Sequence, residues 1–255
     1  MTPPIRAIVS DLDGVVYRGE TAIPGAVETI ADWARRGIPY VFVTNNSAKS
    51  AKAFADKLRR LGVALSDAQV LTSTDATAAY VGRHFRAGIA TYVIGEAALV
   101  DAVTAAGASL VDHERADLVV LGSDYDFNFR KMFVATRALR AGAALVVTNP
   151  DVIAPLEDGV EPCVGAFLAA LLAAAPDVVP AIVGKPSPLM ILEALERLGT
   201  RPEETIMVGD QIATDIIAGQ SAGLRSYLVS TGIPNPHASV RPDAEIASLA
   251  EIPVG

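Results

Sequence analysis

Two carboxylates stand two positions apart near the start of the chain, in the stretch DLDGVVY at residues 11–17. Asp11 and Asp13 follow directly on a short apolar run. Like charges at this spacing repel each other, and a carboxylate near a core is costly to bury unless its charge is compensated. A solvated turn is the plain alternative. An EF-hand calcium loop is excluded, because it needs Asp or Asn at the fifth position and Gly at the sixth, whereas here Val15 is fifth and Gly14 comes too early.

Further polar side chains follow other apolar runs that are typical of strands. PYVFVTNN ends in Thr44, Asn45 and Asn46, and the runs AIVG and TIMVG are followed by Lys185 and Asp210. In an open parallel sheet the ligand crevice lies outside the carboxyl ends of the strands. An acidic pair, a hydroxyl, two amides, a lysine and another acid would converge there. This set of groups suits a phosphate and a divalent cation.

The spacing of apolar residues predicts the elements that must position these groups. Short β-branched runs indicate strands, and apolar residues at helical spacing indicate helices. The first strands are expected at 5–10 and 39–46, and the first helices at 26–37 and 47–62. We expect Ser47 to cap the second helix and Gly62 to end it. Alternation of strand and helix predicts an α/β fold with a doubly wound parallel sheet.

The same alternation restarts in the middle of the chain. Strands are expected at 91–95, 116–123 and 143–151. The Ala-rich stretch at 164–175 is expected to be a buried helix, since a membrane-spanning helix needs roughly 20 apolar residues. One echo links the two regions: the triplet TNN at 44–46 and the triplet TNP at 148–150 both end a strand.

The composition limits the partners of the protein. The chain has 255 residues, of which 51% are hydrophobic, so it can bury a large core. Its net charge of −8 argues against nucleic acid or an anionic membrane as the main partner, because both bind basic surfaces. A small anionic substrate in one local site remains compatible with this charge. The single cysteine, Cys163, excludes an intrachain disulfide, and without a signal-peptide pattern we expect a cytoplasmic protein.

Four motifs in order resemble those of the haloacid dehalogenase superfamily. They are DLDGVVY at 11–17, VTNNS at 43–47, GKPSP at 184–188 and GDQIATDI at 209–216. More closely, the chain is similar to the NagD-like branch, which includes nitrophenyl-phosphatase and the phosphoglycolate, glycerol-phosphate and pyridoxal phosphatases. The resemblance covers essentially the whole chain. It implies a Rossmann-like catalytic core formed by 1–80 and 180–255, with a smaller α/β cap domain inserted at 81–179.

The resemblance also implies a Mg²⁺-dependent phosphatase of small phosphomonoesters that works through an aspartyl-phosphate. Asp11 would be the nucleophile, and Asp13 would protonate the leaving group and then deprotonate the attacking water. Asp11, the backbone carbonyl of Asp13 and Asp210 would bind Mg²⁺, with Asp215 orienting the site behind them. Gln211 departs from the pattern, because relatives often carry arginine at that position.

The remaining expected contacts involve the substrate itself. Thr44 and the amides of Asn45 and Asn46 would bind the phosphoryl oxygens, and Lys185 would neutralise the charge that builds up there. In the cap, Asp124 of the stretch LGSDYDFNF is the expected contact to the substrate.

Two other functions and several substrates stay open. A phosphomutase of the same superfamily would return the phosphoryl group to its substrate, and a phospho-signalling receiver would keep it. The substrates compatible with the resemblance are sugar phosphates, phosphoglycolate, glycerol phosphate, nucleoside monophosphates, pyridoxal phosphate and nitrophenyl phosphate. A homodimer through the cap is a further expectation that rests on the resemblance alone.

Overall fold

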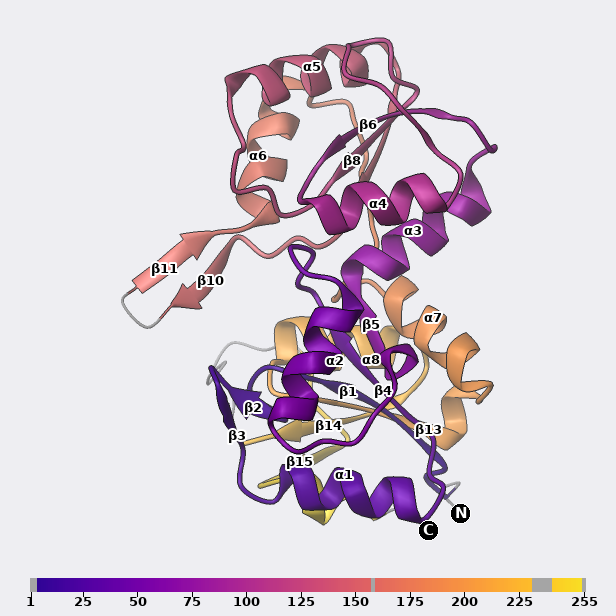
Figure 1. The fold of residues 1–255 in the computed structure, drawn as a ribbon, viewed down its shortest axis with the longest axis vertical. Coiled ribbons are helices and arrows are strands. Elements are labelled where there is room, and N and C mark those ends of the chain that lie inside the picture. Colours follow the sequence, from indigo (N-terminus) through magenta and orange to yellow (C-terminus); the bar gives the residue numbers. More distant parts are fainter. Residues whose placement is uncertain (1–3, 157–158, 231–239, 254–255) are drawn as a thin grey trace. The chain divides into compact units, whose positions relative to one another are not determined.

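The computed structural model of the chain describes residues 4–156, 159–230 and 240–253. They form two compact units, which are drawn in Figure 1. The first unit takes its described residues from Met1–Thr44, Ala51–Leu71 and Lys185–Gly255, and the second from Asn45–Ser50 and Thr72–Gly184. The boundary expected at 80/81 falls inside helix α3 (Ser73–His84). That helix belongs to the second unit because it packs against α4 (Ala97–Ala105).

The first unit is built on a six-stranded sheet in the order β15-β14-β13-β1-β4-β5. Strand β1 lies near its middle and pairs in parallel with β13 and with β4. Outside them, β14 pairs in parallel with β13 and with β15. The strands of this sheet are β1 (Ala7–Asp11), β4 (Tyr40–Thr44), β5 (Val70–Thr72), β13 (Thr205–Gly209), β14 (Arg225–Val229) and β15 (Ala244–Ile246).

Helices and a short hairpin complete the first unit. Every residue of β1, β4 and β13 is buried, as expected for central parallel strands covered on both faces. In the core beside the sheet, the ring of Tyr40 packs against both Trp33 and Phe42. The helices are α1 (Ala26–Arg35), α2 (Ala51–Arg60), α7 (Leu189–Leu198) and α8 (Ile217–Ser221), and the hairpin is β2 (Tyr17–Arg18) with β3 (Thr21–Ala22).

The second unit has its own parallel sheet, in the order β12-β9-β8-β6-β7. A separate core forms beside it, in which the rings of Phe127 and Phe167 stack with centroids 4.4 Å apart. The strands are β6 (Ala90–Ile94), β7 (Ser109–Leu110), β8 (Leu118–Leu121), β9 (Ala144–Val147) and β12 (Ala181–Ile182). Besides α3 and α4, the helices are α5 (Phe129–Arg140) and α6 (Val164–Ala174).

One prediction about a helix start is wrong. Ser47 does not cap the second helix, because α2 begins only at Ala51. The Ser47 hydroxyl instead bonds to Ser123 and Thr148 of the second unit, and its side chain is fully buried. The Ser47 hydroxyl therefore makes tertiary hydrogen bonds instead of capping the helix. Gly62 does follow the end of α2, with a positive φ of 97°.

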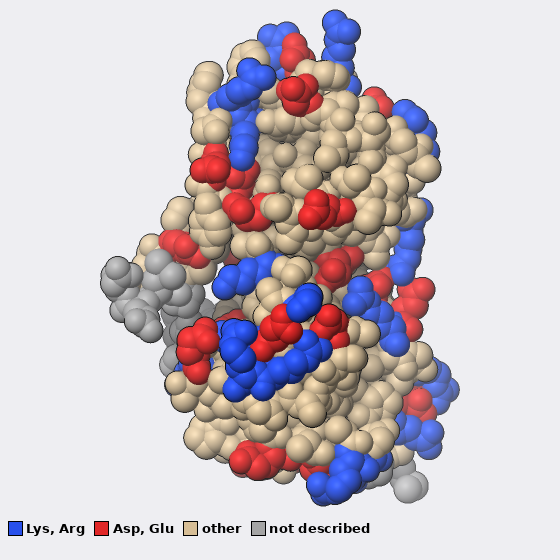
Figure 2. Space-filling view, in the orientation of Figure 1, with Lys and Arg blue, Asp and Glu red and all other residues tan. Residues whose placement is uncertain are grey.

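A hairpin of β10 (Ile153–Leu156) and β11 (Gly159–Pro162) was not expected from the sequence. In Figure 1 it extends away from the sheet of its own unit. No helix in the described part of the chain is both long enough and apolar enough to cross a membrane. On the face shown in Figure 2, basic and acidic side chains are mixed. Two surface ion pairs of helix α2 join Lys52 to Asp56 and Arg59 to Asp67, which lies after the helix.

Candidate active site

The centre of the candidate site is a lysine held between two carboxylates. Asp11 is the last residue of β1, and Lys185 and Asp215 come from distant parts of the chain. Lys185 Nζ lies 2.6 Å from Asp11 Oδ1 and 2.6 Å from Asp215 Oδ1. All three side chains are buried, so each charge depends on the other two for compensation. The structure thus brings together three of the residues singled out in the sequence.

Asp210 joins this cluster from the end of β13. One carboxylate oxygen from each of Asp11, Asp210 and Asp215 lies within 4.8 Å of the others. Gly14 lies directly beside Asp210: a Cβ at this glycine would be 2.1 Å from Asp210 Oδ2, and its φ is +79°. Asp210 Oδ1 is buried and has no hydrogen-bond partner among the described residues.

The charges in the cluster shift one another's protonation. Burial opposes the charge of Lys185, but Asp11 and Asp215 outweigh it and hold the lysine pKa above its usual value. Burial raises the pKa of Asp11, against the opposing effect of Lys185. Burial, with the nearby charge of Asp215, raises the pKa of Asp210 to about 6. Three acids around one lysine leave a surplus of negative charge that another cation would relieve.

Asp13 lies on the exposed side of the same turn. The hydroxyl of Tyr17 donates to Asp13 Oδ2 at 3.2 Å. Burial, followed by the charge of Asp13, raises the pKa of Tyr17, so the phenol stays a donor. The ammonium group of Lys57 lies over the ring of Tyr17, with Nζ 3.7 Å from the ring centroid. Asp13 is therefore oriented by a neutral donor, and its carboxylate remains accessible to solvent.

The residues expected to bind phosphate belong partly to each unit. Thr44 is buried at the end of β4, one position beyond Val43, which is the register partner of Asp11. Asn45 and Asn46 directly follow it and belong to the second unit. Asn45 Nδ2 donates to Asp151 Oδ2 at 3.0 Å. The carboxyl ends of β1 and β4 therefore carry the nucleophile candidate and the hydroxyl candidate side by side.

Asp124 lies in the loop between β8 and α5 of the second unit. Its carboxylate is 2% exposed, and both oxygens accept from Lys131 Nζ, at 2.7 and 2.6 Å. The backbone N–H of Asp126 also donates to Asp124 Oδ1. Lys131 is the more accessible member of the pair, with 29% of its side chain exposed. Contact of Asp124 with a substrate stays a prediction.

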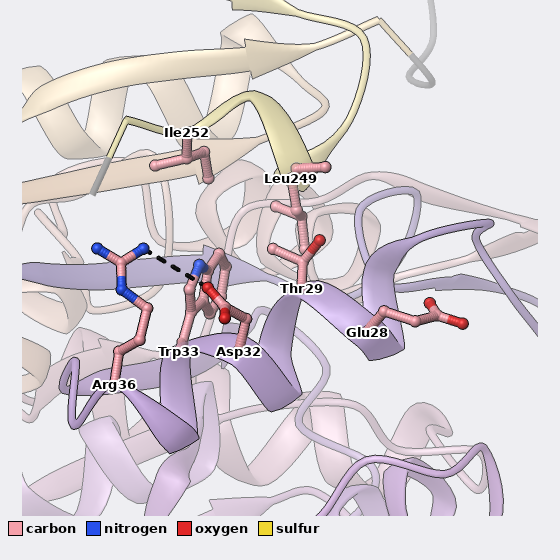
Figure 3. Close-up of a pocket in the computed structure, with 8 residues that line it drawn as sticks. Glu28, Thr29, Asp32, Trp33, Arg36, Leu249 and Ile252 are labelled. Atoms are coloured by element: carbon pink, nitrogen blue, oxygen red, sulfur yellow. Dashed lines mark ion pairs between the residues drawn. The ribbon is translucent and has the colours of Figure 1, made fainter. Parts of the chain in front are cut away.

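A cavity elsewhere in the first unit does not include the candidate residues. It has a volume of about 300 Å³ and lies between α1 and the segment that contains Leu249 and Ile252. Figure 3 shows Asp32 at this cavity, paired with Arg36 at 3.5 Å. None of Asp11, Asp13, Lys185, Asp210 and Asp215 is among the residues that line it.

Comparison with known proteins places this geometry in a family. Residues 8–109 match the haloacid dehalogenase-like hydrolase model, and residues 182–252 match a second model of HAD-hydrolase-like proteins. The 5′-nucleotidase YutF of Bacillus subtilis is 39% identical over 228 residues, which are 89% of this chain and 88% of that protein. The chain belongs to the haloacid dehalogenase-like hydrolases.

Two further relatives agree with this membership. An acid sugar phosphatase of Staphylococcus aureus is 37% identical over 89% of this chain and 87% of its own length. The structure of NagD from Escherichia coli K-12 is 33% identical, with a TM-score of 0.90 and 98% of each chain covered. The resemblance to the NagD-like branch, the α/β fold class and the expected class of phosphomonoester hydrolase are confirmed.

The acidic cluster of this haloacid dehalogenase-like hydrolase fits a divalent cation. Hard divalent cations prefer oxygen ligands, and three carboxylates offer them here within 4.8 Å of one another. The buried oxygen of Asp210 is a ligand atom for which the described residues supply no donor. The raised pKa of Asp210 also fits a cation site, since burial and Asp215 both disfavour a negative charge that no cation compensates.

Two contacts in the site were not anticipated. Tyr17 is part of the motif DLDGVVY, but strand-end reasoning assigns it no role because it lies beyond the strand. Gln211, the one mild departure from the family pattern, holds Asp215 through its backbone. The N–H of Gln211 donates to Asp215 Oδ2, and its carbonyl accepts from the N–H of Asp215. Neither contact uses the glutamine side chain.

Proposed function

We propose that the protein hydrolyses small phosphomonoesters through an aspartyl-phosphate formed on Asp11. The observation that carries this proposal is Lys185, fixed 2.6 Å from both Asp11 and Asp215 beside the carboxylate of Asp210. A lysine in this position neutralises an incoming phosphate while its bond to Asp215 keeps it in place. Asp11 lies at a strand end, where a nucleophile is rigidly held.

The chemistry divides between the two aspartates of the first motif. Asp11 would attack phosphorus, and the bond from phosphorus to the ester oxygen would break as Asp13 donates a proton to that oxygen. Water would then attack the aspartyl-phosphate, give its proton to Asp13, and release phosphate while Asp11 is regenerated. The exposed position of Asp13 and its contact with Tyr17 support this role, because it must reach both the leaving group and water.

Mg²⁺ is the proposed cofactor. Asp11, Asp210 and the backbone carbonyl of Asp13 would hold it, and Asp215 would orient Lys185 and Asp11 from behind. When bound, Mg²⁺ would offset the repulsion between the phosphate dianion and the carboxylate that attacks it. Thr44 and the amides of Asn45 and Asn46 would hold the phosphoryl oxygens.

The second unit is proposed as a cap that selects substrates. It has its own sheet and core, and the four motifs place no catalytic carboxylate in it. Relatives named as a 5′-nucleotidase and an acid sugar phosphatase support small phosphorylated metabolites as the substrate class. A cytoplasmic location and a homodimer stay predictions.

A phosphatase screen tests the proposed function. Sugar phosphates, nucleoside monophosphates, phosphoglycolate, glycerol phosphate, pyridoxal phosphate and p-nitrophenyl phosphate would each be incubated with the protein, with Mg²⁺ and then with excess chelator. We expect continuous release of inorganic phosphate that stops in chelator. Transfer of the phosphoryl group to a substrate hydroxyl would indicate a phosphomutase, and stoichiometric labelling without turnover would indicate a receiver. Full activity in chelator would reject the metal.

A further inference from the structure

A buried asparagine of the second unit contacts the loop that follows Thr44. This residue, Asn149, belongs to the TNPD stretch after β9 and is 3% exposed. Its Nδ2 donates to the backbone carbonyl of Asn45 at 2.7 Å. The hydroxyl of Ser73, at the start of α3, donates to the same carbonyl oxygen at 2.6 Å. Two donors thus converge on a single backbone oxygen in the loop.

The direction of that carbonyl fixes the direction of the next N–H. The carbonyl of Asn45 and the N–H of Asn46 belong to one peptide group, which is planar. In a trans peptide the oxygen and the hydrogen point to opposite sides of the chain. Ser73 and Asn149 therefore hold the N–H of Asn46 so that it points away from them.

The same stretch is itself firmly held. The N–H of Asp151 donates to Asn149 Oδ1 at 3.1 Å, and Asp151 Oδ2 accepts from the side chain of Asn45. The N–H of Gly184, the residue before Lys185, donates to the carbonyl of Thr148 at 2.8 Å. A Cβ on Gly184 would be 2.4 Å from that carbonyl oxygen, so the two backbones are in close contact. The TNPD stretch therefore braces the residues next to both Thr44 and Lys185.

We propose that Asn149 is a positioning residue for phosphoryl binding. It holds the peptide between Asn45 and Asn46, with Ser73, in the orientation that aims the N–H of Asn46 at a phosphoryl oxygen. This role rests on the proposed function, in which Asn46 binds the phosphoryl group, and it assigns that contact to the backbone N–H of Asn46. Asn149 does not touch the phosphate and acts only through the peptide that it orients. Asn149 thereby affects phosphate affinity itself, for every substrate alike.

The substitution Asn149→Asp tests this role with little change in shape. The new carboxylate keeps the acceptor for the N–H of Asp151, but it replaces the donor by an oxygen that repels the carbonyl of Asn45. Kinetics with p-nitrophenyl phosphate and with a sugar phosphate would give kcat and KM, and inhibition by inorganic phosphate would give Ki. We expect Ki to rise about tenfold or more. We expect kcat/KM to fall about 10- to 100-fold, and this factor should be the same for both substrates. The loss is somewhat smaller than that caused by removing a charge-stabilising donor altogether. Ki is informative because the fraction of folded enzyme does not change it.

Two further variants complete the test. Ser73→Ala removes the other donor to the same oxygen and is expected to raise Ki in the same direction, so the role remains testable if Asn149→Asp does not fold. Ser123→Ala is the matched control, since it removes a hydrogen bond to Ser47 in the same polar cluster without touching Asn45. Its Ki should equal that of the unmodified protein.

The outcomes separate the two proposals. If the unmodified protein releases phosphate but Ki is unchanged in both Asn149→Asp and Ser73→Ala, the positioning role is rejected and the proposed function stands. If Ser123→Ala raises Ki as much as they do, the effect is general to the cluster and the role is likewise rejected. If the unmodified protein releases no phosphate from any ester, the proposed function fails, and this role fails with it.

Discussion

Gly14 and Asp210 lie so close together that no other residue fits at position 14 without moving the carboxylate. The added Cβ would be 2.1 Å from Asp210 Oδ2 and 2.6 Å from the carboxylate carbon. The left-handed conformation of Gly14, with φ of +79°, is a second reason for glycine. The motif DLDGVVY, which contains Gly14, thus restricts the position of Asp210 in the motif GDQIATDI.

The substitution Gly14→Ala should therefore displace Asp210 and impair cation binding. We expect kcat/KM to fall by at least about tenfold at limiting Mg²⁺, with part of the loss recovered at high Mg²⁺, because a displaced ligand weakens affinity. Gly19→Ala is the matched control, because Gly19 also has a positive φ, of 52°, but nothing lies within 4 Å of the added Cβ. It should cost about 1–2 kcal/mol of stability for the backbone conformation and leave the Mg²⁺ dependence unchanged. Equal Mg²⁺ titrations for both variants would contradict the prediction.

Asp11→Asn should abolish turnover without unfolding the protein. The amide cannot attack phosphorus, but its oxygen can still accept from Lys185, and Lys185 keeps its bond to Asp215. We expect at least about a thousandfold loss of kcat, with a melting temperature close to that of the unmodified protein. Activity above a few per cent in the purified variant would remove Asp11 from the role of nucleophile.

Lys185→Met should instead destabilise the protein strongly. It leaves the buried carboxylates of Asp11 and Asp215 without the cation that compensates them. Removing one partner of a buried ion pair typically costs about 3–5 kcal/mol, which urea unfolding in the absence of Mg²⁺ would detect. Lys52→Met is the control, since Lys52 pairs with Asp56 on the surface and its loss should change stability little. A urea unfolding curve for Lys185→Met that matches the curve of Lys52→Met would show that Lys185 is not needed for charge compensation.

Asp210→Asn should stabilise the protein when no metal is bound. Burial raises the pKa of Asp210 from 3.8 to about 6. Above pH 6 the ionised carboxylate therefore lowers the free energy of unfolding. The penalty is on the order of 2–3 kcal/mol at pH 8, and it shrinks as the pH falls from 6 towards 4, where the folded protein takes up a proton before the unfolded chain does. Thermal unfolding in chelator at pH 8 and at pH 4.5 would measure both values. Asp177→Asn, which changes an exposed carboxylate, is the control variant. An Asp210→Asn variant less stable than the unmodified protein at pH 8 would rule out the penalty.

Asp124→Ala and Lys131→Ala should have the same effect on substrate choice. Asp124 is buried and holds Lys131, so any influence on a substrate passes through the accessible ammonium group. We expect both variants to reorder the rates across a panel of phosphomonoesters while the Mg²⁺ requirement stays constant. If Asp124→Ala slowed every substrate by one common factor, this pair would be structural, and substrate selection would lie elsewhere in the second unit.

Strand-end reasoning located the charged cluster because parallel strands place their ends at a common edge. Asp11 and Lys185 are far apart in the sequence, yet this reasoning placed both at that edge, and they meet in the structure. Asp215, which contacts the same lysine, was expected only from the resemblance to the haloacid dehalogenase superfamily. The start of α2 was predicted wrongly, because local capping preference cannot weigh the partners that Ser47 finds in Ser123 and Thr148. The contacts of Thr148 and Asn149 are likewise tertiary hydrogen bonds that local sequence patterns do not reveal. The echo between TNN and TNP was visible, but only the tertiary structure shows that one loop holds the other.

The hairpin of β10 and β11 was missed for a different reason. Pro155 and Pro162 argue against strands, since proline cannot donate to a ladder. The dipeptide DG that ends at Gly159 was the available signal for a turn between two strands. The hairpin is a separate two-stranded sheet, so each of its strands is an edge strand, which tolerates proline where a central strand does not. Sequence spacing alone does not distinguish the two cases.

The central position of β1 determines when the protein can become active during its synthesis. Its partner β13 and the lysine that contacts Asp11 come from the last third of the chain, with 174 positions separating Asp11 from Lys185. The second unit, by contrast, takes most of its residues from one continuous stretch, Thr72–Gly184. A ribosome delivers that stretch before β13, and closing the longer loop is slower and entropically more costly. A nascent chain would thus carry a folded second unit while β1 is still unpaired on its β13 side, and catalytic competence would arrive only after β13 has been synthesised.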